Sequence, residues 1–217
     1  MNSSDEQWVY VVDDDPGMID STLWLLESVG LRGLPYTSGQ AFLEDCQDDA
    51  PACILLDVRM PGLGGLGVQE ALADRGIRLP VIFVSGHADV PIVLRAFRAG
   101  AFDFLEKPYN EQLLLDSVQK ALQQRRAQHQ RIRAEQALDA KLATLTARER
   151  DVFLPLAQGY GNREVAEQLG ISVKTVDLYR SRVMKRLQAT SLPDLVGMAV
   201  AAGLLDPLNL RPLPPNG

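Results

Sequence analysis

The chain has few of the residues that build zinc sites and disulfide frameworks. It holds two cysteines, Cys46 and Cys53, and two histidines, His87 and His129, among 217 residues. Neither cysteine has a CxxC or metal-ligand spacing, so a zinc box and a disulfide-dense secreted domain are excluded. No apolar run approaches the roughly 20 residues needed to span a bilayer, and the acidic start lacks a signal-peptide pattern. These absences predict a soluble, cytoplasmic protein with no membrane partner.

Charge is unevenly distributed along the chain. Residues 1–124 contain 8 Lys/Arg and 19 Asp/Glu, a net charge of −11, whereas residues 125–217 contain 14 and 9, a net charge of +5. A chain of 217 residues is long enough for two domains. The basic part either meets nucleic-acid phosphates or is an ordinary solvated helical surface, and charge alone does not decide between these.

Short apolar runs alternate with helical patterns in the front part. Strands are expected at 8–13, 34–36, 52–58, 79–85 and 101–105, and helices at about 17–29, 40–48, 66–75, 90–99 and from 110 onward. The strand runs are almost continuously apolar, which is typical of strands buried on both faces of a parallel sheet. The pattern predicts an α/β domain with a five-stranded, doubly wound parallel sheet.

Chemically active side chains follow four of these strands. Asp13 and Asp14 end the first strand, Asp57 the third and Ser85 the fourth, and Lys107 follows the fifth. Ligands of such sheets bind outside the carboxyl ends of the strands, so these side chains should converge. Crowded carboxylates need a cation, oxygen ligands suit Mg²⁺, and a lysine can hold a phosphate oxygen. The sequence predicts a phosphoryl site built on an aspartate nucleophile.

The motifs VVDDDP, LLDVRMPGLGG, VSGHAD and FLEKP resemble, in order and spacing, the receiver domain of bacterial two-component response regulators, a CheY/flavodoxin-like fold. The resemblance covers about residues 7–123. It implies phosphoryl transfer from a sensor histidine kinase to one aspartate, with Mg²⁺ as cofactor. The residues that it implies are Asp57 as phosphoacceptor, Asp13, Asp14, Asp57 and the backbone carbonyl of Arg59 as metal ligands, Ser85 as switch hydroxyl, Lys107 as phosphate-binding lysine and Phe104 as switch aromatic.

The resemblance also implies how the switch works. A phosphoryl group on Asp57 would draw Ser85 inward and open space for Phe104, which is otherwise a core aromatic. A cis peptide is frequent in the family before the proline at 108. Arg59 and His87 flank the approach of water and are expected to tune the lifetime of the acyl phosphate, although His87 is equally well explained as an exposed loop residue.

A connector without glycine or proline follows the receiver-like part. Residues 124–143 are rich in Gln, Arg, Ala and Glu, which are good helix formers. They form either a dimerising or signal-transmitting helix, or a solvated linker that is helical or frayed. Apolar positions are too sparse for a coiled coil, which favours the solvated linker. The Gln-rich composition is also compatible with a flexible tether.

The rear part has the signals of four helices. Thr146 and Glu149 form a capping-box pattern, and Gly159 and Gly161 end the first helix. The second helix is expected at 162–169, the third from a cap at Ser172 to about 187, and the fourth from Ser191 to about 202. A short helix, a glycine turn and a longer basic helix are the outline of a helix-turn-helix.

The segment LTARERDVFLPLAQGYGNREVAEQLGISVKTVDLYRSRVMKRL resembles the LuxR-type DNA-binding domain over about 144–205. With a receiver in front, the chain resembles NarL/FixJ-type regulators, and GHADVP and AFDFLEKP lean toward the FixJ branch. Gly161 and Tyr179 depart from the family, which usually has Ser or Thr and His there. By position, Lys174, Thr175, Asp177, Leu178 and Ser181 are expected to reach base edges, and Asn162, Arg180, Arg182 and Lys185 to reach phosphates.

The expected organisation is a receiver at 1–123, a helical linker at 124–143, a DNA-binding domain at 144–206 and a disordered tail at 207–217. The expected function is phosphorylation-controlled transcription regulation in bacteria, without turnover of a separate substrate. The expected partners are a sensor histidine kinase, double-stranded promoter DNA, a second copy through residues 90–105 on phosphorylation, and RNA polymerase. Two alternatives are an aspartyl phosphohydrolase, which would place its nucleophile after the first strand and carry a cap domain, and a constitutive DNA binder.

Overall fold

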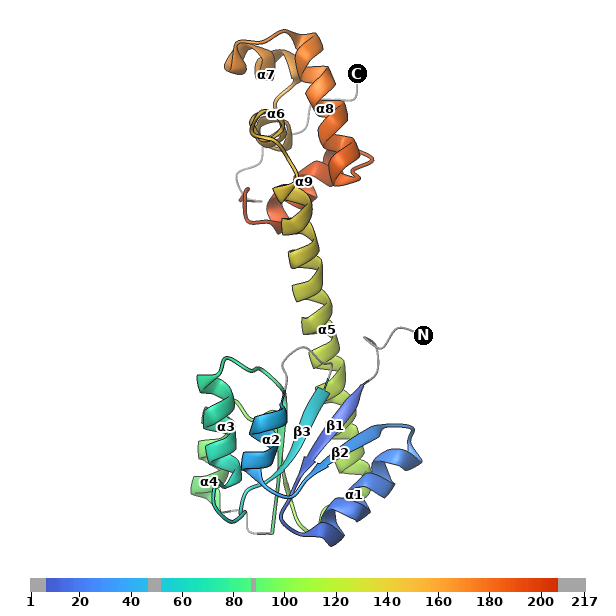
Figure 1. Cartoon of the computed structure of the whole chain (residues 1–217), viewed down its shortest axis with the longest axis vertical. Helices are drawn as coiled ribbons and strands as arrows, with labels where there is room; N and C mark the ends of the chain where they lie inside the picture. The colour runs from blue at the N-terminus through green and yellow to red at the C-terminus, as the bar shows by residue number, and fades with distance from the viewer. Residues whose placement is uncertain (1–6, 47–51, 87–88, 207–217) are drawn as a thin grey trace. The chain divides into compact units, whose positions relative to one another are not determined.

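The structure is a computed structural model that describes residues 7–46, 52–86 and 89–206 (Figure 1). It contains two compact units, residues 1–130 and 131–217. His87 and the tail at 207–217 lie outside the described residues.

The first unit is built on a five-stranded sheet in which all strand pairs are parallel. Its strands are β1 (Trp8–Val12), β2 (Arg32–Tyr36), β3 (Ala52–Asp57), β4 (Val81–Ser85) and β5 (Asp103–Glu106). Their order across the sheet is β2-β1-β3-β4-β5. This confirms the doubly wound α/β fold that alternating apolar runs predicted. The order also places β1 and β3 side by side at the centre, so that their carboxyl ends are neighbours.

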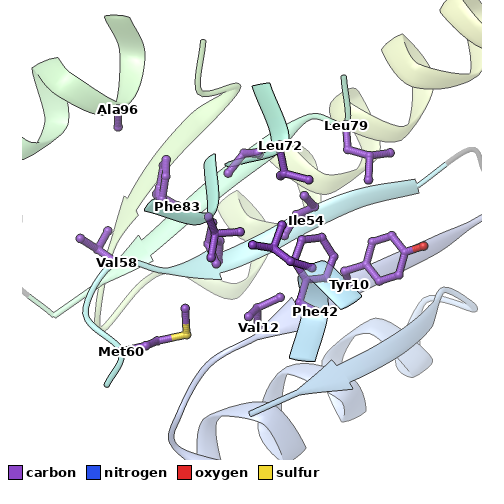
Figure 2. Close-up of a cluster of buried hydrophobic side chains, with 14 of the residues drawn as sticks. Tyr10, Val12, Phe42, Ile54, Val58, Met60, Leu72, Leu79, Phe83 and Ala96 are labelled. Atoms are coloured by element: carbon purple, nitrogen blue, oxygen red, sulfur yellow. The ribbon is translucent and has the colours of Figure 1, made fainter. Parts of the chain in front are cut away.

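Helices cover both faces of this sheet, and each face has its own core. One core packs strand side chains such as Tyr10, Ile54 and Phe83 against α2 (Gly39–Asp45), α3 (Gly65–Asp74) and α4 (Val90–Arg98) (Figures 1 and 2). The other packs the alternate strand residues against α1 (Pro16–Ser28) and the first part of α5 (Glu111–Ala143). Burial on both faces explains why the strands read as unbroken apolar runs.

Helix α5 is continuous through the segment expected to be a linker. Leu114, Val118 and Leu122 belong to the core of the first unit, and Leu138 and Leu142 pack in a core of the second. Arg125, placed in the linker by the sequence, is 2% exposed, and its Nη1 donates to the carbonyl of Arg78 at 3.4 Å. The first unit thus continues past the expected boundary at 123. The residues from Arg131 to Ala137 are exposed, as a solvated helix requires.

The second unit consists of the end of α5 and four further described helices. These are α6 (Ala147–Ala157), α7 (Asn162–Leu169), α8 (Val173–Leu187) and α9 (Leu192–Ala201). Side chains cap α6, α8 and α9 at Thr146, Ser172 and Ser191, as the sequence predicts. Gly161 has no side chain, so at α7 only Glu164 contributes, accepting from Gly161 N at 2.8 Å. Gly170 ends α7 in the left-handed conformation, with φ 64°.

Candidate phosphoacceptor site and DNA-binding face

The strand ends bring together Asp13, Asp57 and Lys107, three of the side chains expected to form the phosphoryl site. Asp13 and Asp57 are each 7% exposed, and Ser85 is 1% exposed. The site is anchored by backbone bonds from the strand ends: Asp13 N donates to Tyr36 O at 3.1 Å, and Lys107 N donates to Ser85 O at 2.8 Å. The peptide bond between Lys107 and Pro108 is cis, as the family resemblance suggested.

The Lys107 ammonium bridges the two buried carboxylates. Its Nζ lies 2.6 Å from Asp13 Oδ2 and 2.8 Å from Asp57 Oδ1. Burial lowers the pKa of Lys107, but the hydrogen bonds to Asp13 and Asp57 outweigh this and raise it overall. Burial raises the pKa of Asp57, and repulsion from Asp13 adds to this, while Lys107 and the Arg59 amide oppose it. Asp57 is therefore a desolvated carboxylate held by one cation and one amide.

The other Asp57 oxygen is fixed by the following loop. Arg59 N donates to Asp57 Oδ2 at 2.6 Å. A Cβ added to Gly65, at the start of α3, would lie 2.3 Å from the backbone oxygen of Asp57. Only glycine permits this approach without displacing backbone, so Gly65 supports the site. Sequence reasoning assigned no role to Gly65; the signal for it is the glycine pair that follows Asp57 in PGLGG.

The donor chemistry fits Mg²⁺ only in part. Asp13 and Asp57 provide two carboxylates at one point, and Mg²⁺ is commonly bound by one or two carboxylates together with waters. Asp14 is exposed, and no group of three His, Cys, Asp or Glu side chains in the described segments has a metal-binding arrangement. Asp13 and Asp57 are thus the residues that would hold the ion. Asp14 and the Arg59 carbonyl remain predictions.

Phe104 lies beside this edge, on β5. It is half-buried against the α2–α3–α4 core, with its ring centroid 6.1 Å from that of Phe83. Its partial burial is compatible with a side chain that occupies more than one position, which stays a prediction.

Helix α8 presents the expected DNA-binding residues on one exposed face. Six of the nine expected contact residues are exposed on α8: Lys174, Asp177, Leu178, Ser181, Arg182 and Lys185. Their spacing of three and four residues puts them on one side of the helix. Val176, Val183 and Leu187, which the sequence assigned to the core, are fully buried.

Four expected contact residues make hydrogen bonds within the protein. Thr175 is half-buried, and its hydroxyl lies 2.8 Å from that of Ser172. Asn162 Nδ2 donates to Asp177 Oδ1, and Arg180 Nη1 donates to Asn162 Oδ1 at 3.4 Å. The sequence did not predict this connection between α7 and α8, because the partners are 15 and 18 residues apart.

None of the described helices is long and apolar enough to cross a membrane.

The fold and site define a receiver joined to a helix-turn-helix, and comparisons with known proteins agree. The model of the response regulator receiver domain matches residues 9–119, and that of the bacterial regulatory proteins of the luxR family matches residues 143–199. Nodulation protein W of Bradyrhizobium diazoefficiens is 41% identical over 196 residues, covering 90% of this chain and 86% of that protein. Transcriptional regulatory protein FixJ of Azorhizobium caulinodans is also 41% identical, covering 90% and 93%.

Solved structures of response regulators are also similar to this chain. The response regulator StyR matches with a TM-score of 0.85 and 34% identity, covering 90% of this chain and 98% of that one. Full-length FixJ from B. japonicum matches with a TM-score of 0.55 and 35% identity, covering 94% and 100%. The chain belongs to the NarL/FixJ family of response regulators, on its FixJ-like branch. It is a phosphorylation-dependent, DNA-binding transcription regulator, and not a metabolic enzyme.

Proposed function

We propose that Asp57 is the residue that accepts the phosphoryl group, from the phosphohistidine of a cognate sensor kinase. The observation that carries this proposal is the buried Asp57 carboxylate, held between Lys107 Nζ and Arg59 N. A carboxylate oxygen of Asp57 forms the new bond to phosphorus as the bond to the histidine nitrogen breaks. In this proposal Lys107 and the Arg59 amide, which contact the two Asp57 oxygens, offset charge on the phosphoryl oxygens. Bound Mg²⁺, held by Asp13 and Asp57, would supply further charge stabilisation.

Readout is proposed to pass through Ser85 and Phe104. The new phosphoryl group accepts a hydrogen bond from the Ser85 hydroxyl, and Phe104 moves toward the space that Ser85 leaves. A phosphoryl group adds charge and acceptor oxygens to a buried edge, which is enough to bias a two-state element. Loss of the group by hydrolysis at Asp57 resets the switch without turnover of any other substrate.

Output is proposed to require two copies of the chain. Helix α4 has an apolar face at Val90, Leu94 and Phe97, which are 69%, 49% and 47% exposed. Contiguous exposed apolar side chains commonly mark interaction surfaces. Pairing through residues 90–105 would bring two α8 helices to adjacent half-sites of promoter DNA in the bacterial cytoplasm, where RNA polymerase is the further partner.

A mobility-shift titration on promoter DNA tests the proposal. Acetyl phosphate with Mg²⁺ should raise the DNA affinity of the wild-type chain and leave that of Asp57→Asn unchanged. Asp74→Asn, which removes the charge of an exposed aspartate at the end of α3, is the matched control and should respond like wild type. Equal affinity of wild type with and without acetyl phosphate would instead support a constitutive DNA binder.

A further inference from the structure

Two side chains on the exposed face of α8 differ in character from the basic residues around them. Asp177 is exposed, and Leu178 is 50% exposed. The affinity of a protein for DNA comes largely from cations that neutralise phosphates. A carboxylate on the same face opposes that attraction, and an isobutyl group adds nothing to it. Their place beside Lys174, Arg182 and Lys185 therefore points to specific partners, not to general attraction.

The Asp177 carboxylate is positioned by a chain of hydrogen bonds. Asn162 is the first residue of α7, and its Nδ2 donates to Asp177 Oδ1. Arg180, one turn further along α8, donates from Nη1 to Asn162 Oδ1 at 3.4 Å. This chain fixes one oxygen of Asp177. Its other oxygen, Oδ2, can accept from a donor outside the protein, because the side chain is exposed.

We propose that Asp177 accepts a hydrogen bond from the exocyclic amino group of a cytosine in the major groove, and that Leu178 packs against the methyl group of a nearby thymine. In that groove cytosine presents an amino donor, adenine presents an amino donor next to the N7 acceptor, guanine presents two acceptors, and thymine presents an acceptor and a methyl group. A carboxylate thus favours cytosine, because the acceptors of guanine, of thymine and at N7 of adenine repel it. The inference rests on the proposed contact of α8 with base edges and adds the bases that it selects.

Asn162 has a role inside the protein besides the phosphate contact that its position suggested. Its amide joins Arg180 and Asp177, so we infer that it is a positioning residue for the carboxylate. Lys174 lies one turn before Asp177, and Arg182 and Lys185 lie toward the end of α8. These exposed cations retain the attraction to the DNA backbone that the carboxylate opposes.

Selection from a randomised duplex pool tests the base preference. The full chain with acetyl phosphate and Mg²⁺ should enrich duplexes with a fixed cytosine in each half-site. Asp177→Asn should shift that one position toward adenine, because an amide pairs with the N6 and N7 edge of adenine. Asn162→Ala should weaken the cytosine preference at that position while keeping the rest of the motif. Glu167→Gln removes one exposed acid from α7 and should leave the motif unchanged.

A base lacking the amino group gives a sharper test. Pyrimidin-2-one at the selected cytosine removes the proposed donor, and wild-type affinity should fall about ten-fold. The same replacement should cost Asp177→Ala nothing further, and at a position outside the half-site it should have no effect in either protein. The inference would be overturned if the cytosine preference survived Asp177→Asn, or if pyrimidin-2-one lowered the affinity of wild type and Asp177→Ala equally. Either result would leave the proposed DNA-binding function intact. Failure of the wild type to enrich any duplex would contradict the DNA-binding function itself.

Discussion

Lys107 and Asp57 form a direct ion pair, with Nζ 2.8 Å from Oδ1, where the side chains are only 19% and 8% exposed. The same ammonium contacts Asp13 at 2.6 Å, so one cation balances two carboxylates that would otherwise repel each other. Because Mg²⁺ is proposed to use those two carboxylates, the ammonium and the metal compete in part for the same oxygens.

Removing that ammonium should therefore separate metal binding from phosphorylation. In Lys107→Met we expect Mg²⁺ to raise the melting temperature by more than in wild type, because a cation competing for Asp13 and Asp57 is gone. The rate of phosphorylation by acetyl phosphate should fall by about 10²-fold, as on loss of one transition-state donor. Thermal melts across a Mg²⁺ titration and phosphate-affinity gels measure the two effects. Lys120→Met, at an exposed lysine of α5, is the control. If Lys107→Met had the same Mg²⁺-dependent rise in melting temperature and the same phosphorylation rate as wild type, the role assigned to Lys107 would be contradicted.

The raised pKa of Asp57 gives a pH dependence of stability. Burial raises this pKa above its ordinary value, so the folded chain holds the proton more tightly than the unfolded chain. The resulting stability is present at low pH and is lost as pH rises through the folded pKa. An asparagine side chain does not titrate, so without Mg²⁺ the Asp57→Asn variant should gain stability relative to wild type as pH rises toward 7. Denaturant unfolding of the full chain at several pH values measures the difference in stability between Asp57→Asn and wild type. A difference that does not change with pH would contradict the prediction.

Glu149 should give the opposite dependence of stability on pH. It is 2% exposed, its Oε2 accepts from Thr146 N and Oγ1 at 2.9 Å each, and its Oε1 lies 3.2 Å from Arg186 Nε. The hydrogen bond from the Thr146 amide is the main reason that its pKa is lowered. Its contribution is therefore present above the ordinary pKa of a glutamate and is lost as pH falls through the lower folded value.

Replacement by glutamine tests this contribution. Glu149→Gln should destabilise the DNA-binding unit by about 1 kcal/mol at pH 7, because it removes the negative charge from the hydrogen bonds to Thr146 and from the ion pair with Arg186, and by less in acid. Glu167→Gln, at an exposed glutamate of α7, should change stability little at either pH. Denaturant midpoints at pH 7 and pH 4 provide the measurement. A larger loss in acid than at neutral pH would show that the sign is wrong.

The apolar face of α4 predicts a surface variant that separates phosphorylation from self-association. Leu94→Glu places a charge on that face and should prevent the phosphorylation-induced dimer, while acceptance of the phosphoryl group at Asp57 is unchanged. Val29→Glu places the same charge on an exposed apolar side chain after α1, 44% exposed, and should dimerise normally. Light scattering with and without beryllofluoride reports the mass. If the Leu94→Glu variant still formed a dimer with beryllofluoride, the apolar face of α4 would not be the interface.

Much of this site could be predicted from the sequence, because its parts follow from local patterns. Continuous apolar runs indicated the parallel sheet, and strand ends then placed Asp13, Asp57 and Lys107 together, as found. The bond between Asn162 and Asp177 could not be predicted, since it depends on how α7 packs on α8. The burial of Arg125 was missed for a related reason. A Gln- and Arg-rich helix predicts solvated arginines, and the sequence does not show that the segment before β4 lies beside Arg125.

The burial of Arg125 leads to a prediction about where the receiver ends. Its side chain is among the largest fully buried ones, and Nη1 reaches the Arg78 carbonyl just before β4. Arg125→Ala removes a buried stem and charged donors together, so the receiver should lose about 2 kcal/mol of stability. Arg126→Ala, at the adjacent and exposed arginine, should lose much less. Denaturant unfolding of the full chain, followed by near-ultraviolet circular dichroism, compares them. If the two variants lost the same amount of stability, the receiver would end at residue 123 and Arg125 would belong to a solvated linker.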